Sequence, residues 1–319
     1  MANYIIKRLF WLIPTIFFVT IIVFLLVRWI PGTAVDVIEA SLTQSGSANI
    51  DRAAIYHMLG LDVPIHIQYV RWIGGIFLHG DFGDSIIQGR PVLQMIVERM
   101  PATIELGILS VIVEFGLALP LGVYSAARQD KTSDYILRVF AVLLIAVPSF
   151  WIATLVMVYP SIWWGWSPSM ELIPFVKNPL GNLGMFIIPA IINGSMNAGM
   201  GMRLTRTMML EVMRQDYIRT AWSKGLNERT VLVRHAIKNA FIPVVTILGG
   251  SVANILGGAV MMEQIFNIPG MGLFMLQSLS QRDYPIISAS TLLMAIIVLL
   301  VNLLVDISYN WLDPRVKYQ

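Results

Sequence analysis

Long apolar stretches alternate with short clusters of charged residues along this chain. Six of the stretches can each supply the ~20 residues that a helix needs to cross a bilayer. They are Leu9–Val27, Leu106–Ala127, Val139–Met170, Asn178–Met202, Asn239–Met262 and Tyr284–Val305. We therefore predict an all-α, polytopic membrane protein with six transmembrane helices.

The composition agrees with this pattern. Hydrophobic residues make up 56% of the 319 residues and charged residues only 13%, whereas ordinary soluble domains carry about a quarter charged residues. The net charge of +3 therefore gives no argument for a nucleic-acid partner. The sequence contains no cysteine, which excludes disulfides, thiolate metal sites and cysteine nucleophiles.

The cations are distributed unequally between alternate connections. If the odd-numbered connections lie outside, seven of the 22 Lys and Arg residues face outward and 15 remain inside. The outward seven are Arg28, Arg52, Arg71, Arg90, Arg99, Lys177 and Arg282. This bias predicts that both termini are cytoplasmic. The first apolar run is longer than that of a signal peptide, about 7–15 residues, and no small-residue cleavage site follows it, so we expect it to remain as a helix.

The most informative stretch is the charged connection at 214–243, between the fourth and fifth spans. Asp216 is suited to an N-cap, because its carboxylate can accept from backbone N–H groups of the first turn. Apolar residues then recur at helical spacing, and we expect Ala221 and Trp222 to offer the packing face. Gly225 is expected to end this helix in a left-handed conformation.

A second helix is predicted directly after this turn. Asn227 can cap it, and Glu228 in its first turn is favourable near the positive end of the helix dipole. The connection therefore reads as a short basic helix, a glycine turn and a second helix that runs on toward the fifth span. All of it lies on the cytoplasmic side in the predicted orientation.

Segments of this connection resemble a known family signature. Tyr217–Ala221, Lys224–Leu226 and Arg234–Ala240, followed by Pro243, are similar to the cytoplasmic signature of the inner-membrane permeases of ABC importers. The dipeptide, oligopeptide and nickel branch is the most similar. The broader family has a Glu-Ala-Ala…Gly pattern; here Arg-Thr-Ala stands in its place, and the distance from the glycine to the proline is longer.

In that family the loop is the coupling helix, which docks into a groove on the ATPase subunit. The resemblance implies that the segment around 216–226 performs this role here. The candidate coupling residues are Asp216, Tyr217, Arg219, Thr220, Ala221, Trp222, Lys224, Gly225 and Arg229. From local chemistry alone, a solvated basic loop retained inside by its charge is an equal alternative.

Other family-like phrases occur in the family's order from Tyr4 to Arg315, among them Glu98–Leu106, Phe266–Gly272 and Arg282–Pro285. The resemblance therefore covers nearly the whole chain and implies the type I ABC importer permease fold. The expected organisation is an N-terminal transmembrane helix (1–30), an extracytoplasmic segment (31–99), a membrane core (100–312) with a cytoplasmic coupling loop (207–238), and a cytoplasmic tail (313–319).

The resemblance implies that the chain is a membrane subunit of an ATP-driven importer in the cell (inner) membrane. Its expected partners are a second permease, expected to be a different chain, two ABC ATPase subunits, an extracytoplasmic solute-binding protein and the lipid membrane. ATP and Mg would be bound by the ATPase subunits, and this chain would carry no cofactor or metal and no catalytic residue. Peptides or a related small solute are the expected cargo, and the sequence does not name which.

Two features of the spans are open to more than one interpretation. Gly250, Asn254, Gly257 and Gly258 recur on one face of the fifth span, where they would line a pathway or, more simply, allow close helix packing. Glu114 lies about midway along the second span, where an ionisable group requires a partner or a wet cavity.

The sequence lacks the motifs of several classes of enzyme and nucleotide-binding protein. The chain has no G-x-x-x-x-G-K-[ST] phosphate loop, no H-E-x-x-H and no Gly-x-Ser-x-Gly, and its four histidines are scattered. A secondary transporter or channel that works without ATPases is the alternative from another class. Such carriers often use paired intramembrane acids and inverted repeats, whereas Glu114 is a lone central acid here. A membrane enzyme is a more distant alternative.

Overall fold

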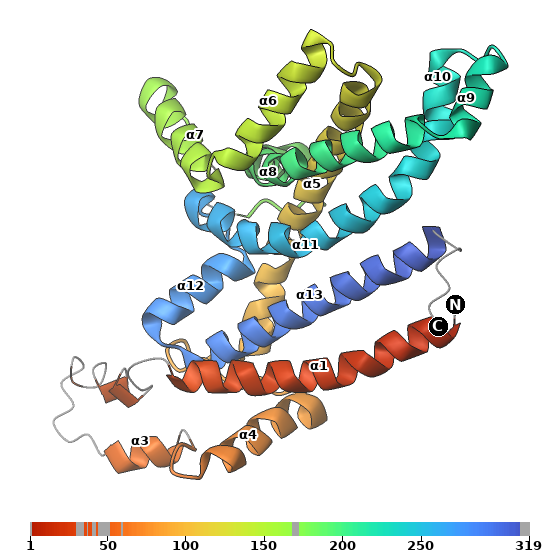
Figure 1. Cartoon of the computed structure of the whole chain (residues 1–319). Coiled ribbons are helices and arrows are strands. Elements are labelled where there is room, and N and C mark those ends of the chain that lie inside the picture. Colours follow the sequence, from red (N-terminus) through yellow and green to blue (C-terminus); the bar gives the residue numbers. More distant parts are fainter. Residues whose placement is uncertain are drawn as a thin grey trace. The chain divides into compact units, whose positions relative to one another are not determined.

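The structure is a computed structural model that describes residues 2–29, 35–36, 38–39, 43, 52–58, 60–167 and 172–312 (Figure 1). Within these residues the regular elements are helices, together with one isolated β-bridge between Asp84 and Pro91. The all-α prediction is confirmed. The predicted tail 313–319 lies outside the described residues, as does part of the predicted external segment 31–99.

The helices differ widely in length, and two of the short elements, η1 and η2, are π-helical. In chain order they are α1 (Ala2–Trp29), α3 (Arg52–Met58), α4 (Ile65–Gly74), η1 (Gly75–His79), α5 (Val92–Ala127), α6 (Thr132–Ala146), α7 (Ser149–Trp164), α8 (Pro179–Met213), α9 (Asp216–Ser223), α10 (Glu228–Thr230), η2 (Val231–Ile237), α11 (Lys238–Phe266), α12 (Met271–Gln281) and α13 (Tyr284–Leu312).

Five of the described helices, α1, α5, α8, α11 and α13, are each long and apolar enough to cross a membrane. The helices α6 and α7 together supply a sixth candidate, but they are bent by 89° relative to each other. The sixth span, expected within Val139–Met170, is therefore divided between two helices that meet at a bend. Pro148 disfavours helical backbone in the residue before it, and Val147 is extended (φ −87°, ψ 124°), so α6 ends there and α7 begins after the proline.

The chain packs into two compact units. The first comprises 102–269 with the end of α13 from residue 300, and the second comprises 2–101 with 270–299. The long helices α5 and α13 each contribute to both units. The division predicted from the sequence, at residues 30, 99 and 312, separates segments by their side of the membrane and not by packing. It stays a prediction.

In the first unit α8 lies at the centre, packed against α6, α7 and α11. Glycines allow its backbone to approach the neighbouring helices closely. A Cβ at Gly199 would lie 2.7 Å from the carbonyl oxygen of Ala141 in α6, and one at Gly201 would lie 2.7 Å from the Cβ of Ala118 in α5. Without a hydrophobic driving force between helices in lipid, such close contacts supply much of the association energy.

A buried asparagine adds polar contacts to this packing. The Nδ2 of Asn193 in α8 donates to Ser110 Oγ in α5 at 3.2 Å and to the Ile255 carbonyl in α11 at 3.1 Å. Because the hydrocarbon region offers no water to such groups, an amide there is satisfied by neighbouring helices. Three spans of the first unit are thus joined at one point.

The second unit has its own core and its own buried carboxylate. Met95 and Ile96 of α5 pack against Phe274 of α12 and Ile286 of α13, and the guanidinium carbon of Arg99 lies 4.2 Å from the Phe274 ring centroid. Asp283 is buried and accepts from Ser85 Oγ at 2.6 Å. These contacts fix the loop before α5 to the start of α13.

The close approach of α8 to α5 gives a testable prediction. A Cβ at Gly194 would collide with the carbonyl oxygen of Ser110 and lie 2.9 Å from the Cβ of Val113, whereas a Cβ at Gly184 on the same helix meets nothing within 4 Å. Overpacking of this kind costs about 1–3 kcal/mol. We expect Gly194→Ala to lower the midpoint of thermal unfolding in detergent. Gly184→Ala is the matched control and should leave it unchanged or raise it; equal midpoints for the two variants would contradict the packing described.

Candidate functional site

The helix α9, Asp216–Ser223, forms the first part of the predicted coupling segment, and it begins one residue earlier than its predicted cap implies. Gln215 occupies the N-cap position and makes no side-chain capping bond, so the prediction that Asp216 caps the helix is wrong. Asp216 instead lies in the first turn, where a carboxylate is still favourable at the positive end of the helix dipole. Its exposed side chain lies 3.4 Å from Arg219.

One side of α9 packs into the chain's own core. Ile218 is fully buried and Ala221 is 5% exposed, in a cluster with Met209 of α8, Val231 of η2 and Ala240 of α11. This cluster anchors α9 to the ends of two membrane-spanning helices. The sequence analysis assigned Ala221 to the face offered to a partner; its side chain is in fact turned inward.

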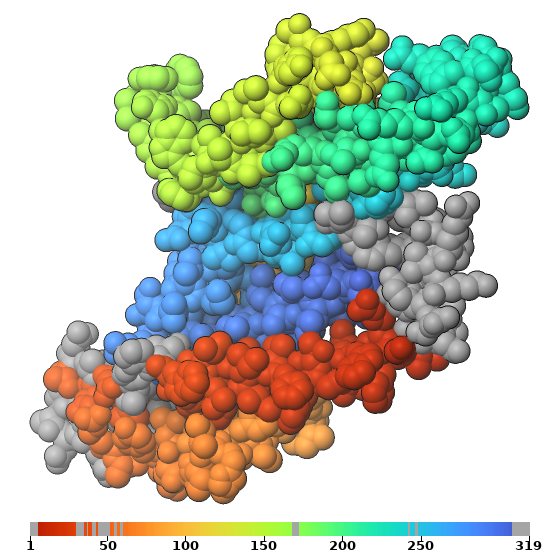
Figure 2. Space-filling model, in the orientation of Figure 1, coloured from red at the N-terminus to blue at the C-terminus, as the bar shows by residue number. Residues whose placement is uncertain are grey.

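The other side of α9 is exposed. Trp222 has 44% of its surface accessible, so it lies on the outward side of α9 and does not share the inward side with Ala221. Tyr217, Arg219, Thr220 and Lys224 are exposed with it, and Arg229 is exposed at the start of the next helix. Figures 1 and 2 show α9 and α10 together as a projection at the ends of α8 and α11. The candidate coupling residues, Ala221 apart, therefore form an outward surface.

The turn after α9 has the conformation that the sequence predicts. Gly225 has φ +72°, which is left-handed, and a Cβ there would meet nothing within 4 Å. Asn227 accepts a hydrogen bond from the backbone N–H of Thr230 at 2.9 Å and so caps α10, with Glu228 in the first turn. Both capping predictions for this part of the connection are confirmed.

From α10 the chain continues without a break into the fifth span. The π-helical segment η2 follows α10 directly and leads into α11, which ends at Phe266. A π-helical turn is uncommon and is found frequently at functional sites. Its side chains Val231 and Ala236 are buried in the same cluster as Ile218. A displacement of α9 would therefore be passed both to α8 and to α11.

A buried ion pair holds this end of the first unit together. Arg206 of α8 donates two hydrogen bonds to the Asp134 carboxylate of α6, from Nε at 2.8 Å and from an Nη at 2.7 Å. Ser125 Oγ at the end of α5 and the Asp130 backbone N–H donate to the same carboxylate, at 2.5 and 3.1 Å. A bidentate guanidinium and two further donors leave this buried carboxylate fully satisfied, which is the condition for a stable buried charge.

Sequence reasoning missed this interaction. Arg206 was counted only as an inward cation, and Asp134 follows a polar turn that gives no sign of burial. The available signal was a single acid at the start of an otherwise apolar helix, which requires a cation on a neighbouring helix when it is buried. Nothing in the local pattern identifies which cation that is.

The candidate residues of the fifth span divide between two faces of α11. Gly250, Asn254 and Gly257 are exposed, and Met261 and Gln264 continue the same face at helical spacing. Gly258 instead lies against Asn193, where a Cβ would collide with the side-chain oxygen Oδ1. The expectation that all four small or polar residues share one face is therefore wrong for Gly258, whose role is close packing.

Glu114 of α5 has the partner that the sequence requires. Its side chain is fully buried, and it accepts from Ser251 Oγ of α11 at 2.6 Å. This bond joins α5 directly to α11, whereas the bonds of Asn193 join α8 to each of these two helices. Glu114 is thus part of the packing of the first unit, and its second carboxylate oxygen has no partner among the described residues.

Comparison with known proteins agrees with this geometry. Residues 118–318 match the family of binding-protein-dependent transport system inner membrane components, and residues 1–107 match the N-terminal family of the same membrane components. The chain belongs to this family. It is accordingly a multi-pass inner-membrane protein and a permease subunit of an ABC transport system, as the sequence analysis predicts.

Full-length relatives carry more specific names. A putative peptide transport system permease protein of Brucella abortus is 38% identical over 318 residues, covering 100% of both chains. The oligopeptide transport system permease protein AppB of Bacillus subtilis is 36% identical over 322 residues, and the dipeptide transport system permease protein DppB of Escherichia coli is 34% identical over 342 residues, each with 100% of both chains covered.

A solved structure supports the fold. A chain of the MetNI methionine ABC transporter, in inward-facing conformations, superposes with a TM-score of 0.55 at 13% sequence identity. The match covers 69% of this permease and 97% of that chain. At this identity the likeness concerns the fold alone, and it agrees with the importer permease fold expected from the sequence.

The buried ion pair of this permease gives a second prediction. Removal of one partner from a buried pair leaves an uncompensated charge, so we expect Asp134→Asn to destabilise the protein by about 3–5 kcal/mol. The control is Asp216→Asn, which removes the acid of an exposed ion pair. The side chain of Asp216 is 95% exposed and that of Arg219 is 76% exposed, so this variant should change the stability little. Thermal unfolding in detergent measures both. Equal, small effects would show that Asp134 does not hold α6 to α8.

Proposed function

We propose that this permease is one of two membrane subunits of an ATP-driven importer for peptides, and that α9 with the turn at Gly225 is its contact with an ATPase subunit. The observation that carries the proposal is the two-sided character of α9. One side is anchored in the chain's own core, and the other presents exposed aromatic and cationic side chains where no described part of the chain covers them.

The anchoring matters because a contact that transmits force cannot move independently of the helices behind it. Ile218 and Ala221 pack against α8, η2 and α11 in one cluster, and the Tyr217 hydroxyl accepts from Asn239 Nδ2 of α11 at 2.9 Å. An ATPase subunit that displaced α9 would therefore displace the inner ends of two spans. Nucleotide binding can drive transport in this way only if it favours one conformation of the membrane helices over the other.

The exposed face of α11 supports a second membrane subunit. Asn254 and Gln264 are polar and exposed on a membrane-spanning helix, and the exposed glycines Gly250 and Gly257 precede and follow Asn254 on the same face. Polar side chains at this depth are costly against lipid, so they face protein or a water-filled pathway. A second permease packed on this side would place the face at the pathway between the two subunits.

The assignment of peptides rests on the three full-length relatives, each of which is named as a peptide, oligopeptide or dipeptide permease. An extracytoplasmic binding protein would deliver the solute, and the ATPase subunits would bind ATP and Mg. This chain would itself catalyse no reaction. The alternative, a carrier driven by an ion gradient, is less well supported because Glu114 is engaged with Ser251 in helix packing rather than paired with a second acid.

The glycine turn provides the third prediction. A β-branched residue is strained in left-handed backbone, whereas asparagine tolerates it. Because no atom lies within 4 Å of a Cβ at position 225, any effect of substitution arises from the backbone and not from a collision. We expect Gly225→Val to abolish ATP-dependent peptide uptake into vesicles and to uncouple or lower ATP hydrolysis, at near-normal abundance. Gly225→Asn should retain most of both activities.

The same vesicles separate the two classes of function. The importer requires ATP together with the binding protein, whereas a carrier would take up solute with an ion gradient alone. Full, coupled uptake by Gly225→Val at normal abundance would contradict the role of this segment, and uptake without ATP would contradict the importer itself.

A further inference from the structure

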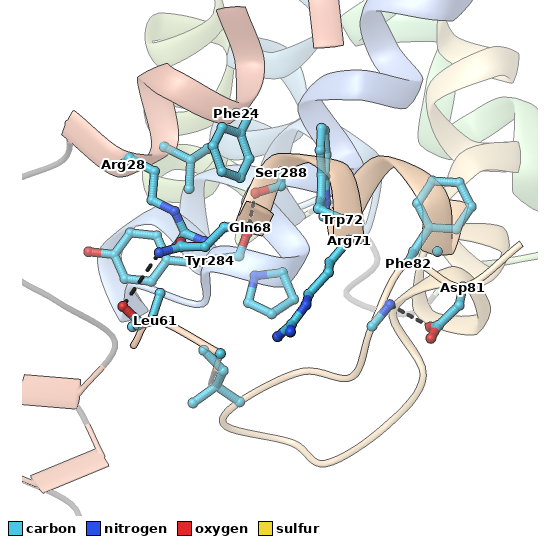
Figure 3. A pocket seen from close by; sticks show the side chains of 16 residues that line it. Phe24, Arg28, Leu61, Gln68, Arg71, Trp72, Asp81, Phe82, Tyr284 and Ser288 are labelled. Carbon is cyan, nitrogen blue, oxygen red and sulfur yellow. Dashed lines mark hydrogen bonds between the residues drawn. The ribbon is translucent and has the colours of Figure 1, made fainter. Parts of the chain in front are cut away.

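A cavity in the second unit is unrelated to the coupling segment. It has a volume of about 340 Å³ and lies between the end of α1, α4, the loop at Asp81–Gly83 and the start of α13 (Figure 3). This size is within the range of about 300–1,000 Å³ that small-molecule sites occupy. Its walls combine aromatic side chains with two arginines, a composition that indicates an anionic, partly apolar ligand.

The position of α4 places the cavity at the depth of the outer leaflet in the predicted orientation. Thr20 and Tyr69 share a hydrogen bond of 2.8 Å between α1 and α4, and the ring centroids of Phe24 and Tyr69 lie 5.5 Å apart. Thr20 precedes the end of α1 at Trp29 by nine residues, or about 13 Å of helix. Half the thickness of the hydrocarbon core is about 15 Å, so α4 lies along the part of α1 that the outer leaflet surrounds.

The outer surfaces of these two helices are apolar. Ile22 and Leu26 of α1 are exposed, as are Ile65 and Val70 of α4 and Phe77 of η1. Side chains of this kind are favourable against acyl chains and unfavourable against water. The cavity therefore opens beside a surface that lipid tails cover.

Two cations face the cavity without an anion. Figure 3 shows Arg28 and Arg71 extending into the space between the helices. Neither guanidinium makes a hydrogen bond or an ion pair with another residue that the structure describes, although Arg28 lies 5.1 Å from the Phe24 ring centroid. Asp81 is the one acid among the 16 lining residues, and it accepts from the Gly83 backbone N–H at 2.8 Å. Two unpaired cations beside hydrocarbon are costly unless an anion joins them.

Gln68 indicates a second property of the ligand, in addition to its negative charge. Its Nε2 donates to the Val63 carbonyl at 2.8 Å and faces the Leu61 carbonyl at 3.4 Å, which leaves Oε1 as a free acceptor. This oxygen is buried and has no hydrogen-bond partner among the described residues. A buried acceptor without a donor costs about 1–3 kcal/mol, so the ligand should bring a hydroxyl or other donor as well as negative charge.

We propose that the cavity binds the phosphoglycerol headgroup of phosphatidylglycerol, with the acyl chains lying along the exposed apolar faces of α1 and α4. The phosphate joins Arg28 and Arg71, for which a guanidinium offers bidentate donors. A glycerol hydroxyl donates to Gln68 Oε1. Phosphatidylcholine fits less well, because the quaternary ammonium of its headgroup cancels the charge of its phosphate and the headgroup has no hydroxyl donor. The bound lipid holds α4 against α1 and the start of α13.

The test is a titration of the full-length chain, purified in a neutral detergent, with short-chain phosphatidylglycerol, phosphatidylcholine of the same chain length, or glycerol 3-phosphate. The midpoint of thermal unfolding should rise saturably with phosphatidylglycerol and stay constant with the other two. An equal rise with phosphatidylcholine would contradict a headgroup site. An equal rise with glycerol 3-phosphate would make this a site for a soluble anion rather than a lipid.

Substitutions in the cavity test whether phosphatidylglycerol binds there. Each basic residue contributes about a fivefold change in affinity, so Arg71→Gln should weaken phosphatidylglycerol binding about fivefold and the double variant Arg28→Gln/Arg71→Gln about 30-fold. Lys177→Gln removes a cation on the same predicted side of the membrane but outside the cavity, and should bind normally. Arg71 is exposed and makes no ion pair with a described residue, so its single variant should fold even if the double variant does not. Unchanged binding by Arg71→Gln would overturn the proposal.

Gln68→Met tests the hydroxyl separately from the charge. The wild-type chain should bind phosphatidylglycerol more tightly than phosphatidic acid, which lacks the headgroup glycerol and its hydroxyls. Gln68→Met keeps both cations and should lose this preference. If the preference were retained, the assignment of a phosphoglycerol headgroup would be wrong.

Discussion

The buried carboxylate of Asp134 is the contact on which the inner end of the first unit depends. It receives hydrogen bonds from Arg206 of α8, from Ser125 at the end of α5 and from the Asp130 backbone N–H in the turn before α6. Three helices thus converge on one charge, close to the cluster that anchors α9 through Ala126 and Met209. If the exposed side of α9 is the proposed contact with an ATPase subunit, a displacement there would reach helices whose ends are already fixed to one another. Such an arrangement favours movement of the unit as a body over local bending.

The same physical constraint explains the polar contacts at greater depth. Hydrocarbon supplies no hydrogen-bond partners, so a buried polar side chain on a span is stabilised when it bonds to a neighbouring helix. Asn193, Glu114 and Thr103 each bond across from one helix to another, to Ile255, Ser251 and Glu263 respectively. Close glycine contacts bring the backbones near enough for these short bonds to form. Asn254 of α11 is exposed and has no such partner among the residues that the structure describes, which is the basis for proposing that a second subunit or the pathway covers this face.

Much of this architecture can be predicted from the sequence because it follows from local rules. Apolar runs of sufficient length give the spans, and the left-handed glycine and the asparagine cap give the turn between α9 and α10. The failures are of another kind. The direction in which Ala221 points depends on the core that α9 meets, and the position of Gly258 depends on Asn193 of another helix. The bend at Pro148 has a local signal, since a proline within an apolar run disfavours helix at the preceding residue, but the length of the run does not reveal it.

The central claim is that the outward face of α9 contacts an ATPase subunit, and cross-linking from a single cysteine tests it most directly. The chain contains no cysteine, so Thr220→Cys on the exposed face and Gly257→Cys on α11 each place one thiol in a defined position. In the assembled importer, a short bifunctional reagent should join position 220 to an ATPase subunit, with a yield that changes between ATP-bound and nucleotide-free states. Position 257 should give no such product. Absence of the product at position 220, or its formation from position 257 instead, would contradict the account.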